Sequence, residues 1–140
     1  MIHNVIMSIR GTQTAPGEAP ETIELTTSGT MSREDGAVIL RYHESPLTGL
    51  ADTTTTFRIE QDRIVLERTG AVQSRMEFVE GTTSESLYRI EEGALLLRVF
   101  AGKMEADFQE NAGYFRLSYS IEIEDTPMGT IEYHITVRPE

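Results

Sequence analysis

Arg68 is the residue whose type and position most clearly suggest chemistry. It follows Ile64 and Leu66 at two-residue spacing in the segment IVLERTG. Residues two apart in a β-strand face the same side, so the cation is in line with two side chains expected to face a core. A guanidinium placed there can pair with a carboxylate of the protein. It can also bind the carboxylate or phosphate of a ligand through its planar fork.

Other polar residues occupy equivalent places in neighbouring segments, at the end of an inward apolar series. They are Tyr42, Glu44, Thr53, Thr55 and Ser74. Consecutive antiparallel strands run in opposite directions, so the end of one strand and the start of the next lie at the same end of the sheet. These residues end or begin successive strands in that alternating order. We therefore predict that they gather around Arg68 at one end of the fold.

Three interpretations of this cluster are open. In the first, Arg68 and Glu44 form a partly buried ion pair that closes the barrel, and the hydroxyls satisfy the remaining donors. In the second, the cluster binds a small amphipathic or anionic molecule in the barrel mouth, which is a common site for ligands. In the third, Glu44 is a general acid or base and Arg68 holds the substrate. No residue is assigned as catalytic.

Other motifs give weaker signals. Alternation places His3 inside but His43 and His134 outside, and no HxH or HExxH spacing is present, so no metal site is predicted. There is no GxSxG motif and no glycine-rich phosphate loop, and no cofactor is predicted.

The elements that must position the cluster are strands, because apolar residues alternate at period two almost throughout. Tight turn signals such as Thr69-Gly70 and Ala101-Gly102 separate them. The expected strands lie near 2–13, 22–32, 36–43, 53–60, 62–69, 72–79, 84–91, 93–100, 103–109, 113–124 and 130–138. Such a meander should close, since closure removes exposed edges. The prediction is an all-β fold: one domain over 1–140, a closed or nearly closed antiparallel meander β-barrel of about 8–11 strands. The segments 14–22 and 44–53 are expected loops, with Leu47 and Leu50 covering one end of the barrel.

Composition limits the classes of partner. The 140 residues include no cysteine and carry a formal net charge of −11. An acidic surface repels phosphate backbones and anionic lipids, so neither nucleic-acid nor membrane binding is expected. The lack of cysteine fits a cytoplasmic protein, and the N-terminal segment reads as a strand, not as a signal peptide.

A resemblance adds to these expectations. The chain resembles the YwiB-like family of small bacterial proteins, which has a lipocalin-like (calycin) β-barrel and no established activity. The resemblance rests on SIRGTQ at 8–13, IELTTSGTM at 23–31, RYHES at 41–45 with LTGL at 47–50, TTTTFRIE at 53–60 and ERTGAVQSRMEF at 67–78. The positions it marks as family-typical are Gln13, Tyr42, Glu44, Gly49, Thr55, Arg68, Gly70, Met76 and Tyr119.

Two functions follow as hypotheses. The first is a binding protein for a small molecule, with Arg68, Glu44, Tyr42, Thr53, Thr55, Ser74 and Tyr119 as candidate ligand-binding residues. The second is a non-catalytic structural or interaction protein with a packed core, acting as a homodimer or a partner-binding module.

Overall fold

The computed structural model describes residues 1–46 and 50–140, and the described chain forms a closed barrel of ten antiparallel strands. Leu47 and Gly49, named above, lie outside the described residues. The strands are β1 (His3–Thr14), β2 (Glu21–Glu34), β3 (Ala37–His43), β4 (Thr53–Ile59), β5 (Ile64–Gly70), β6 (Gln73–Phe78), β7 (Thr83–Ile90), β8 (Gly93–Phe108), β9 (Gly113–Ile123) and β10 (Thr126–Pro139). Each strand pairs with its sequence neighbours, and β1 closes the barrel by pairing with both β2 and β10. The predicted closed antiparallel meander is confirmed.

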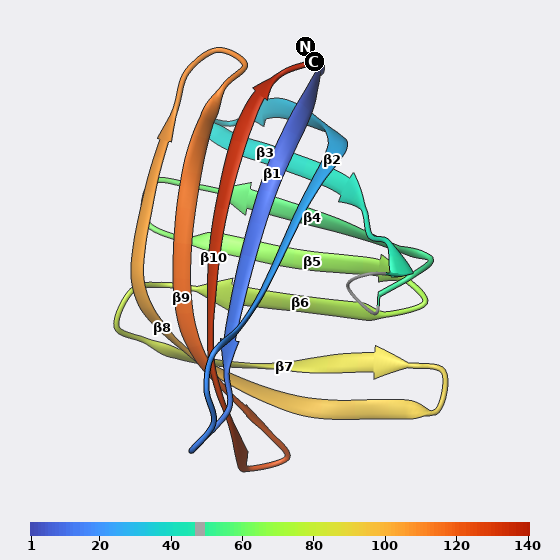
Figure 1. The fold of residues 1–140 in the computed structure, drawn as a ribbon, viewed down its shortest axis with the longest axis vertical. Helices are drawn as coiled ribbons and strands as arrows, with labels where there is room; N and C mark the ends of the chain where they lie inside the picture. Colours follow the sequence, from blue (N-terminus) through green and yellow to red (C-terminus); the bar gives the residue numbers. More distant parts are fainter. Residues whose placement is uncertain (47–49) are drawn as a thin grey trace.

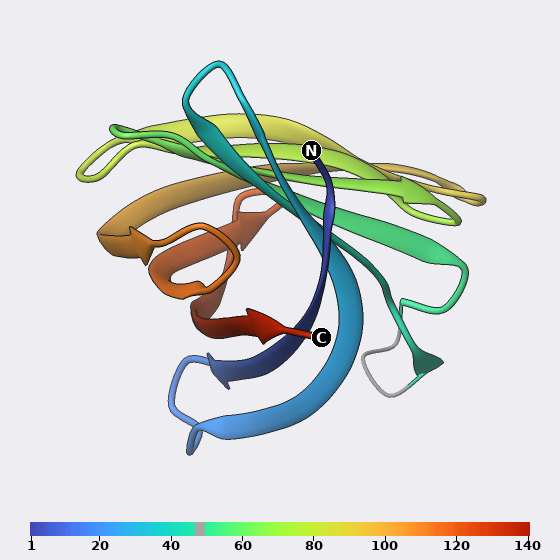
Figure 2. The ribbon, with the colours of Figure 1, turned by 90° about the horizontal axis from the view of Figure 1, so that it is seen from above.

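The barrel is flattened into two layers whose strands cross. In Figure 1, β3 to β7 run nearly horizontally, whereas β1, β9 and β10 run nearly vertically. Seen from above, these two sets lie on opposite sides of the interior, and β2 curves from one side to the other (Figure 2). Crossed packing of this kind needs strands that bend between layers. Among the described residues, no helix is long and apolar enough to span a membrane.

One predicted boundary is wrong, and the cause is a β-bulge. The strands expected at 93–100 and 103–109 are one strand, β8, and the turn expected at Ala101-Gly102 is absent. Ala101 pairs with Tyr119 and Met104 with Leu117, so two residues of β8 oppose Ser118 alone. A bulge bends a strand without ending it, and glycine is frequent there. In the sequence alone, Gly102 is also typical of a turn, which explains the wrong boundary.

The core of the barrel consists of the inward residues that alternation predicts. Phe57 and Phe115, both fully buried, lie with ring centroids 4.9 Å apart, and Phe78 packs on Tyr119 at 4.6 Å. Burying each side chain of this size contributes about 1.5–3 kcal/mol. These rings form the packed part of the interior, and Tyr119 and Tyr133 connect it to the polar cluster.

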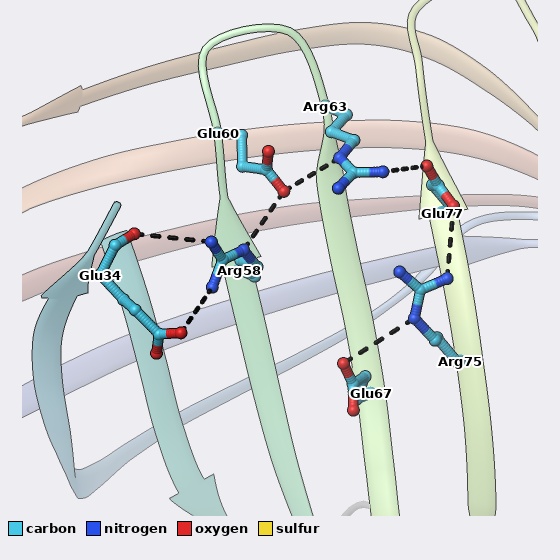
Figure 3. Close-up of polar contacts among 7 residues, drawn as sticks. All are labelled: Glu34, Arg58, Glu60, Arg63, Glu67, Arg75 and Glu77. Atoms are coloured by element: carbon cyan, nitrogen blue, oxygen red, sulfur yellow. Dashed lines mark hydrogen bonds and ion pairs between the residues drawn. The ribbon is translucent and has the colours of Figure 1, made fainter. Parts of the chain in front are cut away.

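A charged network covers the outer surface of β4, β5 and β6. Arg63 bridges Glu60 at 2.9 Å and Glu77 at 2.5 Å, and Arg75 continues from Glu77 to Glu67. Arg58 links the same Glu60 to Glu34, so the chain of contacts crosses several strands (Figure 3).

The charged network shields the side chain of Val65 from water. Val65 faces outward, in register with Arg58 and Glu77, yet its exposed fraction is only 1%. Arginine stems can cover apolar surface while their guanidinium groups stay in water. The network therefore keeps an apolar outer residue dry, a role that strand alternation alone does not predict.

The network predicts an acid-dependent stability. The hydrogen bond from Arg63 lowers the pKa of Glu77 below its usual 4.5, so its contribution is complete above that value and is lost as pH falls through the lowered pKa. Glu77→Gln should lower the free energy of unfolding by about 0.2–1 kcal/mol at pH 7. The difference should shrink as the pH falls below 4.5, in urea unfolding followed by circular dichroism. Glu91→Gln, at an exposed turn, is the control and should change nothing. A difference independent of pH would contradict the prediction.

Candidate functional site

A cavity of about 400 Å³ opens at one end of the barrel, where β1, β3, β5, β7 and β9 end and the even-numbered strands begin. Its walls are mainly apolar. Those residues include Ile9, Leu25, Met76, Leu97, Ile121 and Ile131. Among its polar lining residues, Arg68 and Tyr42 lie deep, with exposed fractions of 7% and 4%. The site therefore combines an apolar wall with a buried charge.

The polar residues form a belt across five strands, fixed by the pairing register. Tyr42 pairs with Thr55, Thr55 with Arg68, Arg68 with Ser74, and Ser74 with Tyr88. Directly opposed residues in antiparallel strands have Cβ atoms about 4.5–5.5 Å apart. Tyr42, Thr55, Arg68, Ser74 and Tyr88 are called the polar belt below.

Arg68 is a buried cation whose hydrogen bonding is incomplete. Its Nη2 donates to the Tyr133 hydroxyl at 3.2 Å, and its buried Nε has no hydrogen-bond partner. Burial opposes the charge, but Tyr133, Tyr119, Tyr42 and the Glu44 carboxylate outweigh it and raise the pKa of Arg68. The guanidinium therefore stays charged, and at least one of its donors is unused. Leaving a buried donor unpaired costs about 1–3 kcal/mol, and more for a charged group.

The expected ion pair between Arg68 and Glu44 does not form within the described part of the chain. Glu44 instead accepts a hydrogen bond from Thr55 Oγ1 at 2.5 Å, and its negative charge contributes to the raised pKa of Arg68. Glu44 comes two residues after Tyr42, one level nearer the barrel end. Strand alternation gives the level and side of a residue but not the direction of its carboxylate, which explains the difference.

The tyrosines are neutral hydrogen-bonding groups. Burial, followed by the Glu44 carboxylate, raises the pKa of Tyr42. Burial also raises the pKa of Tyr119, with a further contribution from Tyr133. Both phenols therefore keep their protons at neutral pH and can donate to an anion.

The seven candidate residues are distributed between the cavity, the wall and a groove. Tyr42, Glu44, Arg68 and Tyr119 line the cavity. The buried Thr53 and Thr55 belong to the wall, where Thr53 Oγ1 donates to the Ala51 carbonyl at 3.4 Å.

Ser74 lines a second, shallower groove of about 540 Å³ on the outer surface of β5, β6 and β7. Its buried Oγ has no hydrogen-bond partner. The groove lies where β6 and β7 pair only at Gln73 with Arg89 and at Ser74 with Tyr88. Arg68 is among its lining residues, so the belt lies between the cavity and this groove.

The candidate set omitted Tyr133, Tyr88 and Glu21, which also line the cavity. Tyr133 is the hydrogen-bond partner of Arg68. Alternation along its strand places it on the inner face, and this could have identified it as a candidate site residue. Glu21 pairs with Gln13 across β1 and β2. Gln13 lies on the same inner face of β1 as Ile9. Following this alternation to the end of the strand could therefore have identified both Gln13 and Glu21 as residues near the cavity. Among the described residues, no three His, Asp or Glu side chains are close enough to hold a metal ion.

Fold and site together define a small closed β-barrel with an internal cavity and a buried arginine at its base. The chain belongs to the family described as "Domain of unknown function (DUF1934)", whose model matches residues 7–135. It is 26% identical to the "Uncharacterized beta-barrel protein YwiB" of Bacillus subtilis (strain 168) over 105 residues, 75% of this chain and 72% of that protein. The crystal structure of the ywiB protein from Bacillus subtilis matches with a TM-score of 0.87 at 20% identity, covering 99% of this chain and 93% of that one. The resemblance to the YwiB-like family and its barrel is confirmed.

Proposed function

We propose that this protein is a cytoplasmic binding protein that holds a small amphipathic or anionic ligand in the cavity beside Arg68 and Glu44. The observation that carries the proposal is the buried Arg68, with an unused Nε donor and no ion-pair partner among the described residues. A cation removed from water needs a partner, because its desolvation costs several kcal/mol. An anionic group bound at Arg68 would supply that partner.

The shape of the site supports the same function. A cavity of about 400 Å³ lies within the range of small-molecule sites, which are mostly apolar and carry a few oriented polar groups. Here the apolar wall would hold the body of the ligand, and the guanidinium and phenols would orient its polar group.

Two measurements test the proposal together. Protein purified under mild conditions and examined by native mass spectrometry should retain a small molecule, or should bind 1-anilinonaphthalene-8-sulfonate with a rise in fluorescence after that molecule is removed. The sulfonate provides an anion for Arg68, and the rings provide apolar surface for the wall. Protein that carries no ligand and also fails to bind the dye would rule the function out.

The second candidate is an interaction module, and apolar residues on the outer surface favour it. Leu87 on β7 and Phe100 on β8 are 44% and 47% exposed, and Leu87 pairs in register with Leu96. Such residues could be covered in a homodimer or by a partner protein. Light scattering that shows a monomer at tens of micromolar would count against the homodimer.

A further inference from the structure

The charges that line the cavity restrict the ligand more narrowly than the proposed function does. Of the described residues that line the cavity, Arg68 is the one basic side chain, whereas Glu21 and Glu44 are both acidic. The surrounding donors, Tyr42, Tyr119 and Tyr133, are phenols that add no positive charge. A ligand with two negative charges would leave one of them uncompensated next to Glu44, and like charges at close range are strongly unfavourable.

The geometry of the donors fits a planar group. A guanidinium presents parallel N–H donors that match the two oxygens of a carboxylate. Arg68 uses Nη2 for the Tyr133 hydroxyl, and its buried Nε has no hydrogen-bond partner. The Tyr133 hydroxyl lies 3.2 Å from Nη2, so a small anion at the guanidinium lies within reach of a neutral donor as well.

Burial along the walls gives the direction of the ligand. Tyr119 on β9 is 3% exposed, whereas Ile121 and Ile123 farther along the same strand are partly exposed. β8 shows the same gradient from the buried Leu97 to Leu95. From Tyr119 to Ile123 the strand rises about 14 Å, at roughly 3.4 Å per residue. This length of wall is apolar on its inner side.

We infer that the ligand is a monocarboxylate with an apolar body, bound with its carboxylate at Arg68 and its body along the wall toward Ile123. The inference rests on the proposed function and specifies the class and orientation of the ligand. A decyl chain is a suitable body for a test, because one chain can carry different head groups.

Displacement of the bound dye by decanoate, decyl phosphate, decanol and decylamine, each below its micellar concentration, tests the inference on the wild-type protein. Decanoate should bind tightest, by about tenfold or more over decanol, which lacks the charged hydrogen bonds. Decyl phosphate and decylamine should bind more weakly than decanoate. In Arg68→Met the preference of decanoate over decanol should disappear, and Arg68→Lys should keep only part of it.

The outcomes separate the two proposals. If decanol or decyl phosphate binds as tightly as decanoate, the inferred ligand class is wrong, while binding of the dye still supports a ligand-binding cavity. If neither the dye nor any decyl compound binds, the ligand-binding function itself is wrong. The comparison among head groups needs no variant, so a folding defect in an Arg68 variant leaves the test intact.

Discussion

Arg68→Met is expected to weaken ligand binding strongly while leaving the barrel folded. Methionine fills a similar volume without charge, and replacing a buried charge by an apolar residue is often neutral or stabilising. The free energy of unfolding should therefore fall by no more than about 1 kcal/mol, within the range of ordinary substitutions. Affinity for the anionic dye should fall roughly 30-fold, since losing a buried charged partner costs about 2 kcal/mol or more. Urea unfolding and a fluorescence titration measure the two effects.

Arg116→Met is the matched control for this substitution. Arg116 lies on the outer face of β9 and is exposed, so the same change there should alter neither affinity nor stability measurably. If Arg68→Met instead destabilises the protein by about 3–5 kcal/mol, as removal of one partner from a buried pair does, the cation is structural. That result would favour the first interpretation, in which the polar cluster closes the end of the barrel.

Phe57→Ala should have the largest effect on stability. Phe57 is fully buried on β4 and contacts both Phe115 and Tyr133, with ring centroids 4.9 Å and 5.8 Å away. Truncating such a residue removes apolar burial and leaves a cavity, at a cost of about 3–5 kcal/mol. The total free energy of unfolding of a domain is only about 5–15 kcal/mol, so this loss is a large part of it. Urea unfolding should show the transition midpoint shifted strongly downward.

Phe100→Ala makes the same chemical change where the ring is half-exposed. Phe100 is 47% exposed on the outer face of β8, and its loss should change stability by only about 0.5 kcal/mol or less. Similar losses for the two variants would mean that the interior is packed differently from the structure described above.

Much of the fold could be predicted because its signal is local. Alternation at period two is repeated in every strand, and strand direction alone brought Thr55, Arg68 and Ser74 to one level. The register confirms that row of neighbours. The bulge at Gly102 could not be read, because a glycine within a strand and a glycine in a turn look alike without the partner strand.

The site was only partly predictable, and the missing part depends on closure. Tyr133 meets Arg68 across the interior of the barrel, 65 residues later in the chain. Such contacts depend on how the two layers cross, which alternation does not determine. For the same reason alternation allows an Arg68–Glu44 ion pair as one interpretation, although the Glu44 carboxylate accepts a hydrogen bond from Thr55 on the neighbouring strand. Side-chain packing determines which of the two nearby polar groups, Thr55 or Arg68, the Glu44 carboxylate contacts.

The short pairing between β6 and β7 has a consequence for motion. A barrel has no free edge, so opening its wall requires breaking a ladder between two neighbouring strands. Only two register pairs join β6 to β7, whereas β5 and β6 pair from Ile64 to Arg68. Proteins open first where the fewest interactions must be broken. The wall of the barrel is therefore expected to separate most readily between β6 and β7. Water would first reach Ser74 there, the β6 residue that pairs with Arg68.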